Sequence, residues 1–264
     1  IKPIRIIYNC MEQRKTIWIT GASSGIGRAL AIKFANEGWI VAASARRENL
    51  LEELKQENNN INSYPLDVTN VDQCNSVFKK ILDDFKNIEI CVFGSGISDA
   101  KSEKEFNLDK VRKIMEVNFF GTMNSINSIY KYFSEKKSGQ ISIISSVAGY
   151  RGLPVAGAYC ASKSALTSFA ESLYFDMIKK NVRVKLISPG FIKTQITDQN
   201  NSPMPMIKSP EFAANEIYIG LINKKSFEIH FPKTFTFLMK ILKILPIWLY
   251  FKLINIGNIY MKRD

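Results

Sequence analysis

The sequence predicts an α/β protein built on a single doubly wound parallel sheet of about seven strands, with a helical C-terminal extension. Two observations support this fold class. Short apolar segments alternate with longer segments that carry apolar residues at helical spacing, up to about residue 231. Small, polar or charged residues follow most of the short segments directly, which places them at the carboxyl ends of strands. In such a sheet, ligands bind at that edge.

Composition and charge fit a folded globular protein. The chain has 264 residues, of which 46% are hydrophobic and 23% charged. The net charge of +12 would suit nucleic acid, an anionic membrane surface or a basic surface around a site for a phosphorylated cofactor. Lys and Arg are scattered, and no basic run is interleaved with stacking aromatic residues, so we expect no nucleic-acid partner.

Cysteine and histidine usage narrows the chemistry. Cys10, Cys74, Cys91 and Cys160 have neither C-x-x-C spacing nor the density of a disulfide scaffold, which favours a reducing, cytoplasmic compartment. His230 is the single histidine, so a multi-histidine metal site is impossible and we expect no metal. We expect His230 to have a structural role on a late strand.

Three regions are expected along the chain. Residues 1–14 form a poorly ordered extension without the sustained apolar stretch or small-residue cleavage site of a secretory signal. Residues 15–232 form one domain, which contains a substrate loop at 191–209. Residues 233–264 form an amphipathic, basic C-terminal extension.

The first strand, at residues 16–20, leads through a glycine-rich turn into a helix at 28–37. The turn consists of Thr20, Gly21, Ala22, Ser23, Ser24, Gly25, Ile26 and Gly27. Glycines allow the backbone to approach a pyrophosphate, and the helix N-terminus presents free amides and a partial positive charge. This arrangement predicts a dinucleotide phosphate site, although three residues separate the first two glycines instead of one.

The second strand, at residues 39–45, ends in Arg46 and Arg47 and is followed by a helix at 48–57. An acidic residue at this point would accept a hydrogen bond from a ribose 2'-hydroxyl, whereas arginine favours a 2'-phosphate. The pair therefore predicts NADP(H) in preference to NAD(H), which stays an alternative. Two solvated arginines before a helix are the structural alternative.

The third and fourth strands, at residues 61–66 and 88–93, also end in candidate ligand contacts. Asp67, followed by Val68, either accepts from an adenine amino group or caps the helix that begins at Asn70, or does both. Gly94, Ser95 and Gly96 are small enough for close approach of a ligand.

A largely helical segment spans residues 108–133 and contains Asn118 and Gly121. Both residue types lower helix stability at internal positions, which suggests that Asn118 has a task there.

The fifth strand, at residues 140–144, leads to Ser146, and Tyr159 opens a long helix. Tyr159 and Lys163 stand four residues apart and therefore lie on one helical face. We expect the Lys163 ammonium to lower the pKa of Tyr159 toward the working range of a general acid/base. Ser146 would hold the reacting oxygen.

The sixth strand, at residues 182–188, ends in Pro189 and Gly190. The loop that follows is rich in Pro, Asn and Ser, and its length suggests a lid or binding loop. A helix at 211–222 and a seventh strand at 226–231 complete the domain.

In order, these motifs resemble those of the short-chain dehydrogenase/reductase family over about residues 15–232. The matching segments are Thr20 to Gly27, Asp67-Val68, Val117-Asn118, Ile144-Ser145-Ser146-x-Ala148-Gly149, Tyr159-x-x-x-Lys163 and Pro189-Gly190-x-x-x-Thr194. The resemblance implies a Rossmann fold with a nicotinamide cofactor.

The resemblance also implies roles for four residues. Tyr159 would be the general acid/base, Lys163 would hold the nicotinamide ribose and tune Tyr159, Ser146 would polarise the substrate oxygen, and Asn118 would anchor a proton-relay water. Ser146 is chosen over Ser145 because the family's serine lies thirteen residues before the tyrosine, as Ser146 does here.

By the same resemblance, Ile192 and Thr194 would contact the nicotinamide carboxamide, and Arg46 would bind the 2'-phosphate. The helices near 108–133 and 157–179 resemble the family's dimer and tetramer faces, so we expect a homodimer or homotetramer. The complete set of expected cofactor residues is Gly21, Ser23, Ser24, Gly25, Ile26, Gly27, Arg46, Arg47, Asp67, Val68, Ser95, Tyr159, Lys163, Pro189, Gly190, Ile192 and Thr194.

One segment departs from the family pattern. The family usually has Asn-Asn-Ala-Gly after the fourth strand, where this chain has Phe93-Gly94-Ser95-Gly96. The change puts local packing and cofactor affinity in question.

The C-terminal extension carries apolar residues at helical spacing, interrupted by lysines and by Pro246. Its longest uncharged run is too short to span a bilayer. Residues 233–260 would suit an amphipathic segment in a membrane interface, with peripheral contact to the cytoplasmic face. A helix pair that covers the substrate cleft or forms an oligomer interface fits equally.

The sequence thus predicts an NADP(H)-dependent oxidoreductase that interconverts a carbonyl and a secondary alcohol on an apolar, lipid-like small molecule, with Tyr159 as general acid/base. One alternative is a reductase of 3-oxoacyl thioesters on acyl carrier protein, which a shorter, more open substrate loop would favour. The other is a non-catalytic dinucleotide sensor or membrane-associated scaffold, against which the presence of all four predicted catalytic residues argues.

Overall fold

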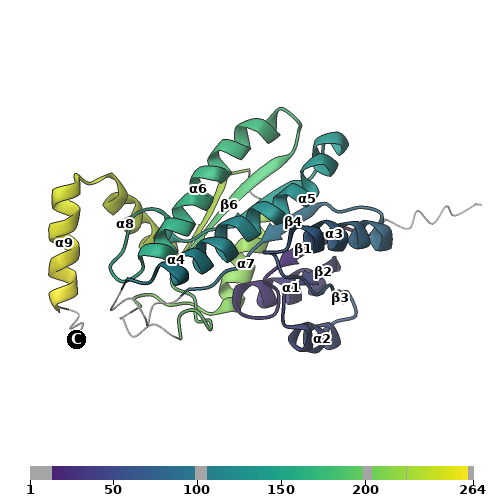
Figure 1. Ribbon diagram of the computed structural model, residues 1–264, viewed down its shortest axis with the longest axis horizontal. Helices are drawn as coiled ribbons and strands as arrows, with labels where there is room; N and C mark the ends of the chain where they lie inside the picture. Colours follow the sequence, from purple (N-terminus) through teal and green to yellow (C-terminus); the bar gives the residue numbers. More distant parts are fainter. Residues whose placement is uncertain (1–13, 99–105, 199–203, 224, 261–264) are drawn as a thin grey trace, which may run out of the picture.

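A single parallel sheet of seven strands forms the centre of the protein in the computed structural model, which describes residues 14–98, 106–198, 204–223 and 225–260 (Figure 1). The strand order is β3-β2-β1-β4-β5-β6-β7. The strands are β1 (Thr16–Thr20), β2 (Ile40–Ser44), β3 (Ile61–Ser63), β4 (Ile90–Phe93), β5 (Gln140–Ile144), β6 (Arg183–Pro189) and β7 (Glu228–Phe231). The predicted doubly wound fold is confirmed.

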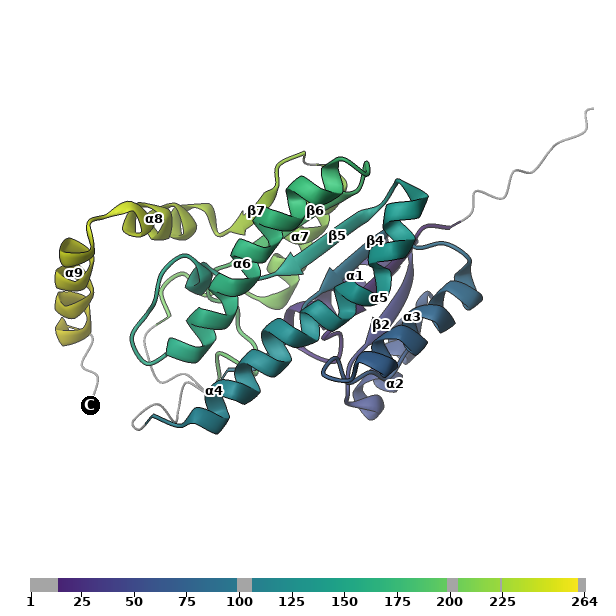
Figure 2. The ribbon, with the colours of Figure 1, turned by 45° about the horizontal axis from the view of Figure 1, so that its top comes forward.

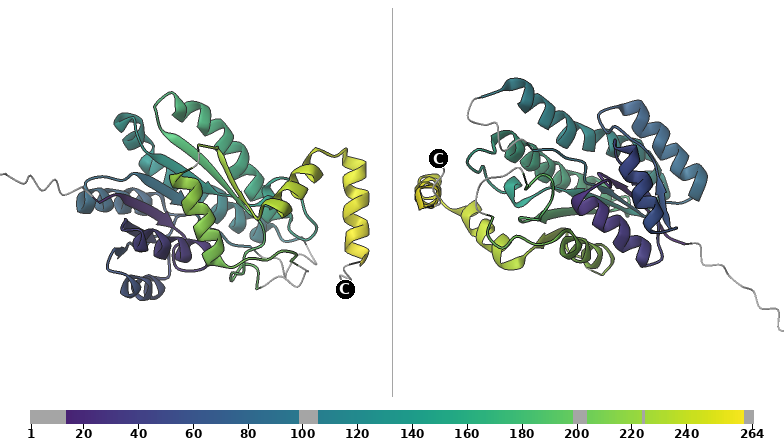
Figure 3. Two further views of the ribbon diagram at one scale, coloured as in Figure 1. Left: turned by 180° about the vertical axis from the view of Figure 1, so that it is seen from behind. Right: turned by 90° about the horizontal axis from the view of Figure 1, so that it is seen from below.

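Helices cover both faces of the sheet (Figures 2 and 3). Buried residues of α1, α2 and α7 pack on one face, and those of α3, α5 and α6 pack on the other. The helices of the domain are α1 (Gly25–Asn36), α2 (Glu48–Glu57), α3 (Val71–Phe85), α4 (Leu108–Met115), α5 (Gly121–Lys136), α6 (Gly157–Ile178) and α7 (Pro210–Ile222). Two further helices, α8 (Lys233–Ile244) and α9 (Ile247–Tyr260), follow the last strand.

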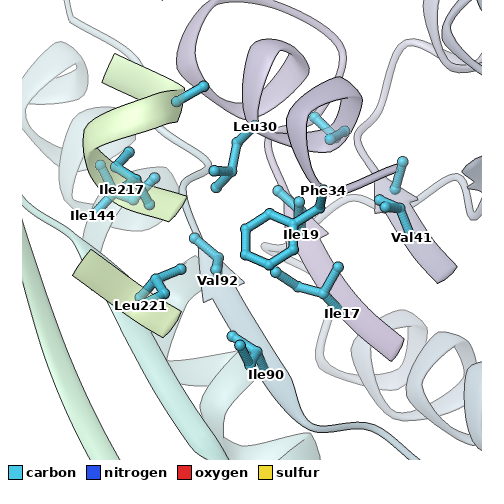
Figure 4. Packing of buried hydrophobic residues seen from close by; sticks show 14 of the residues in the cluster. Ile17, Ile19, Leu30, Phe34, Val41, Ile90, Val92, Ile144, Ile217 and Leu221 are labelled. Atoms are coloured by element: carbon cyan, nitrogen blue, oxygen red, sulfur yellow. The ribbon is translucent and has the colours of Figure 1, made fainter. Parts of the chain in front are cut away.

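Residues of β1 alternate between the two halves of the core. Ile17 and Ile19 face the cluster under α1 and α7 (Figure 4). Trp18 belongs to the cluster on the other face. Side chains of successive strand residues point to opposite faces, so a strand covered on both sides must be apolar throughout. This is why the predicted strands read as continuous apolar runs.

The third strand is shorter than the predicted segment 61–66. It ends at Ser63, because Pro65 has no amide hydrogen to donate to the ladder. Tyr64 and Leu66 still donate to the carbonyls of Ala43 and Ala45, which carries the chain alongside β2 to its carboxyl end.

The sequence predicts one largely helical segment at 108–133, and the structure divides it into three consecutive helical segments. A π-helical turn, Glu116–Phe120, separates α4 from α5, and the amide of Gly121 donates to the carbonyl of Glu116 five residues back. Such turns occur mostly as single bulges at functional positions. Asn118 lies within this turn and is completely buried.

We expect Phe133→Ala to lower the free energy of unfolding by about 3–5 kcal/mol, because the ring is completely buried on α5 and its loss leaves a cavity. Phe106→Ala is the matched control. Phe106 is 87% exposed, so its loss should change stability by no more than about 0.5 kcal/mol. Urea denaturation monitored by circular dichroism measures both, and equal effects would contradict the assignment of Phe133 to the core.

Candidate functional site

A cleft of about 380 Å³ opens at the carboxyl ends of the strands. All seventeen expected cofactor residues line it, together with Ser146, so residues spread from 21 to 194 converge on one space. Asn118 is not among the lining residues, although its neighbour Val117 is. This convergence follows from the parallel topology, which places every strand's carboxyl end at the same edge.

The glycine-rich turn forms one end of the cleft. Gly21 and Gly25 have φ of +76° and +56°, which residues with side chains rarely adopt. A Cβ on Gly27 would lie 2.2 Å from the carbonyl oxygen of Gly21, so only glycine allows α1 to pack this closely on the turn. Ser24 precedes α1, and its side chain forms no capping hydrogen bond. The first amides of α1 are therefore suited to bind an anion such as a pyrophosphate.

The departure at Phe93–Gly96 is compensated locally. The Phe93 ring is buried and contacts Trp18 edge-on, with ring centroids 5.7 Å apart. The amide of Gly94 donates to the hydroxyl of Thr20 over 3.2 Å. A Cβ on Gly94 would lie 2.8 Å from Cδ1 of Ile144, so a larger residue would not fit without movement.

Arg46 and Arg47 both follow β2 but occupy different positions at the cleft. Both are exposed and line the cleft. Arg47 lies across the glycine-rich turn, where it donates to the hydroxyls of Ser23 and Ser24 over 2.9 and 2.6 Å. It also donates to Oε1 of Gln195 over 2.8 Å, which connects the turn to the substrate loop.

Asp67 does not cap the helix that follows it, which corrects one of the two roles considered from the sequence. Its Oδ1 accepts from the amide and the hydroxyl of Thr69, over 3.0 and 2.8 Å. Asn70 is the N-cap of α3 and accepts from the amide of Gln73. Asp67 lines the cleft, where the adenine role stays a prediction.

The side chain of Asn118 holds the loop after β4 in place. Its Oδ1 accepts from the amide of Ile97 over 2.8 Å, and its Nδ2 donates to the carbonyl of Ile97 and to the hydroxyl of Ser162 over 3.0 Å each. These bonds connect the π-helical turn, the β4 loop and α6. The structure therefore shows a positioning task for Asn118, while the water-binding role stays a prediction.

Gly121 is required by packing beside this turn. A Cβ there would lie 2.5 Å from Cγ2 of Val68, on the segment that follows β3. Gly121 lowers helix stability, but its lack of a side chain allows α5 to pack against Val68, which lines the cleft.

Ser146 and Ser145 have different surroundings. Ser145 is buried, and its hydroxyl donates to the carbonyl of Lys163 over 2.8 Å. Ser146 caps a short 3₁₀ turn, Val147–Gly149, by accepting from the amide of Ala148, and it forms a hydrogen bond with Tyr159. Of the two serines, Ser146 therefore faces the phenol.

The expected effect of Lys163 on Tyr159 is wrong for this structure. Burial raises the pKa of Tyr159 to about 12; the hydrogen bond with Ser146 acts in the opposite direction, and the Cys160 thiol adds to the rise. Nζ of Lys163 donates to the carbonyl of Ile144 over 2.9 Å and lies 5.7 Å from the centre of the Tyr159 ring. The ammonium thus sits beside the ring and is bonded to the end of β5.

Burial also lowers the pKa of Lys163 to about 8, because its ammonium loses hydration in the floor of the cleft. Asn118 and Lys163 both lie next to the backbone of Gly96, where a Cβ would be 3.4 Å from Oδ1 of Asn118 and 3.7 Å from Nζ of Lys163. The two polar groups therefore lie beside the same stretch of backbone.

The substrate loop, which the sequence suggests is flexible, is anchored in its described part. Ile192 pairs with Lys208 as an isolated bridge, and the amide of Lys193 donates to the carbonyl of Lys208 over 2.9 Å. The hydroxyl of Thr197 accepts from the amide of Thr194 over 2.8 Å. Residues 199–203 of this loop lie outside the described part of the chain.

Several lining residues were absent from the expected set. Most are neighbours in sequence of predicted residues, and Gln195 makes a side-chain contact with Arg47 across 148 positions of the sequence. The additional lining residues are Ala45, Leu66, Gly94, Gly96, Ile97, Ser98, Val117, Ile144, Ser145, Gln195, Ile196 and Thr197. The glycines were recognisable by their small size, but no sequence signal marked Gln195.

The chain was compared with known families and proteins. The family model for short chain dehydrogenase matches residues 15–205. An uncharacterized oxidoreductase from Myxococcus xanthus is 32% identical over 236 residues, which cover 88% of this chain and 93% of that protein. Dehydrogenase/reductase SDR family member 7 from Homo sapiens is 33% identical over 193 residues. That match covers 70% of this chain but only 57% of the human protein.

A solved structure described as ElxO with NADP bound has a TM-score of 0.72 and 25% identity, and the match covers 82% of this chain and 97% of that one. The family model covers most of the chain, and the order of motifs, the sheet and the converging cleft agree with it. The chain therefore belongs to the short-chain dehydrogenase/reductase family of oxidoreductases.

Proposed function

We propose that the protein is an NADP(H)-dependent oxidoreductase that interconverts a carbonyl group and a secondary alcohol on an apolar small molecule. The observation that carries the proposal is the hydrogen bond between Ser146 and Tyr159, next to the buried Lys163, in the cleft that also contains the glycine-rich turn. A proton donor, a positive charge and a phosphate site are thus within one space.

The residues support a simple division of tasks. A bound nicotinamide cofactor supplies the hydride for the carbonyl carbon. The phenol of Tyr159 donates its proton to the carbonyl oxygen, while the hydroxyl of Ser146 holds that oxygen by a hydrogen bond. The ammonium of Lys163, which donates to the carbonyl of Ile144 beside the Tyr159 ring, binds the cofactor ribose. In the opposite direction, the phenolate accepts the alcohol proton.

Arg46 supports NADP(H) as the preferred cofactor. Its guanidinium is exposed at the rim of the cleft, after the second strand, where it would meet a 2'-phosphate. The similar ElxO structure has NADP bound. We propose the remaining expected residues, including Asp67 for the adenine and Ile192 and Thr194 for the carboxamide, as contacts of the same cofactor. NAD(H) stays the alternative.

An apolar substrate is supported by the side chains beside Ser146. Ile97, Ile144 and Ile196 line the cleft that contains Ser146. Apolar lining near a reacting carbonyl favours an apolar chain over a charged one.

We further propose a homodimer or homotetramer in a reducing, cytoplasmic compartment. Exposed aromatic residues support the first part: Phe120 is 49% exposed beside α5, and Phe175 is 66% exposed on α6. Cys74 and Cys91 are free and buried, which supports the second part.

We expect Tyr159→Phe to reduce carbonyl reduction at least about 100-fold while NADPH binding changes less than about twofold, because only the transferable proton is removed. Steady-state rates on ketones of increasing chain length and nicotinamide fluorescence titration measure the two quantities. Full activity in the variant would move the non-catalytic sensor or scaffold to the front.

We expect Arg46→Ala to weaken NADPH binding by about 10- to 100-fold, the equivalent of one charge-assisted hydrogen bond, and to leave NADH binding nearly unchanged. Titration of the purified protein with both nucleotides measures this selectivity. Arg112→Ala, which removes an exposed arginine on α4, serves as the control. Equal losses for NADPH and NADH would exclude a 2'-phosphate contact.

The pH dependence should follow Lys163. Its pKa of about 8 means that the ammonium is present below that pH and is lost as the pH rises. We therefore expect kcat/KM for reduction to be flat from about pH 6 to 7.5 and to fall above about pH 8. In Lys163→Arg, whose side chain stays charged, this fall should disappear even if the rate is lower. The same fall in both proteins would assign it to another group.

A further inference from the structure

Helices α8 and α9 carry a set of exposed apolar side chains outside the domain core. We call it the α8–α9 surface, and it consists of Phe237, Leu238, Ile241, Ile244, Ile247, Trp248, Phe251, Leu253 and Ile256. The exposed fractions range from 39% for Ile241 to 79% for Ile244. In all views α9 projects from the body of the protein and is joined to it through α8 (Figures 1 to 3).

The corner between the two helices is held firmly against the domain. One guanidinium nitrogen of Arg151 donates to the carbonyls of Leu242, Lys243 and Leu245 at the end of α8, over 2.9, 2.9 and 2.8 Å. The same guanidinium lies 4.3 Å from the centre of the buried Tyr250 ring on α9. Tyr250 in turn donates to the carbonyl of Gly152. The exposed set is thus presented in a defined orientation.

A second connection fixes α8 to the sheet. Nζ of Lys240 lies 2.6 Å from a carboxylate oxygen of Glu228 on β7, and the other oxygen of Glu228 accepts from Tyr150. Burial and this carboxylate both raise the pKa of Tyr150, which keeps the phenol protonated as a donor. Lys240 is therefore paired with a carboxylate of the protein itself and is not counted among the lysines available to a partner.

Charge identifies the occupant of the surface. Residues 229–263 contain no Asp or Glu, whereas Lys243 and Lys252 are exposed on α8 and α9. A second copy of the same helix pair would bring lysines against lysines, which opposes self-association through this face. Anionic lipid headgroups above apolar acyl chains match both the lysines and the apolar side chains.

The length of α9 limits how far it could extend into a lipid bilayer. A helix of 14 residues is about 21 Å long, which is less than the ~30 Å of a bilayer's hydrocarbon core. Within the described ranges, none of the helices has the length and apolar character needed to cross a bilayer. The helix therefore suits the interfacial layer, where apolar side chains reach the acyl boundary and lysines remain at the headgroups.

We propose that the α8–α9 surface docks the protein onto an anionic lipid bilayer, with α9 lying in the interfacial layer. Helix α8 begins two residues after β7 ends, so the docked face lies at the same end of the sheet as the cleft. The docking requires neither cofactor nor turnover, and it can therefore fail or succeed independently of the proposed reaction.

Vesicle binding by the full chain tests the proposal. We expect the protein to float with vesicles of phosphatidylcholine mixed with phosphatidylserine, to float poorly with phosphatidylcholine alone, and to be released partly by high salt. Trp248 provides a direct reporter, since it is 66% exposed while Trp18 and Trp39 are buried. Its fluorescence emission should shift to shorter wavelength on binding, and Trp248→Phe should lose the shift but retain flotation.

Two variants separate insertion from charge. Trp248→Glu combined with Phe251→Glu should reduce the bound fraction by about tenfold or more, because two large apolar side chains are lost from the interface. Lys79→Glu on α3 changes the net charge by the same two units at an exposed position and should bind as the parent does. Thermal melting of each variant verifies that it is folded.

Three results would overturn the proposal. The first is no flotation with either vesicle, and the second is equal loss of binding in Lys79→Glu. The third is self-association in solution that the Trp248/Phe251 double variant abolishes, because a second copy would then be the occupant. Equal binding to neutral vesicles would contradict the role assigned to the lysines.

Discussion

The cleft depends on the close approach of two backbone segments that carry no side chains, at the ends of β1 and β4. A Cβ on Gly21 would lie 2.7 Å from the carbonyl oxygen of Gly94, and one on Gly27 would lie 2.2 Å from that of Gly21. Because Gly21 and Gly27 have no side chains, α1 can begin directly above the sheet edge with its first amides directed to the cleft. A side chain at either position would force these backbone segments apart. The family pattern has Asn where this chain has Gly94, and a Cβ there would lie 2.8 Å from Cδ1 of Ile144, so glycine fits the packing of this chain.

Burial governs the electrostatics at the other end of the cleft. Loss of hydration favours the uncharged forms of Tyr159 and Lys163. The pKa of the phenol therefore rises, and the pKa of the amine falls. At neutral pH the phenol is therefore protonated, while the Lys163 ammonium is retained and loses its proton as the pH rises through about 8. The π-helical turn at Asn118 adds to this preorganisation, since its buried amide is fully engaged with Ile97 and Ser162.

The C-terminal helices connect this end of the cleft to the outer surface. Arg151 and Tyr150 belong to the loop that follows Ser146, and both contact α8 or the strand before it. The loop between the proposed catalytic residues is thus buttressed by a segment that lies beyond the seventh strand. A partner bound to the exposed side of α8 and α9 would therefore contact helices that are hydrogen-bonded to the loop after Ser146, next to the cleft.

The sequence by itself determined the fold class, the seven strands and the positions of the cleft-lining residues at the strand ends. The physical reason is that apolar periodicity, glycine-rich turns and motif spacing are local properties, and parallel topology then brings the strand ends to one edge. Strand and helix boundaries shifted where one residue decided them, as at Pro65. Residues 1–13, including Cys10, residues 199–203 of the substrate loop and residues 261–264 of the C-terminal extension lie outside the described ranges.

Only the tertiary structure decided which partner each polar group takes. Lys163 bonds the end of β5 and not the Tyr159 phenol, Asn70 caps α3 in place of Asp67, and Arg47 reaches Gln195, 148 residues away. For each of these groups, the sequence was compatible with more than one hydrogen-bond partner. The choice among them depends on burial and on distances between segments remote in sequence, which local patterns do not contain.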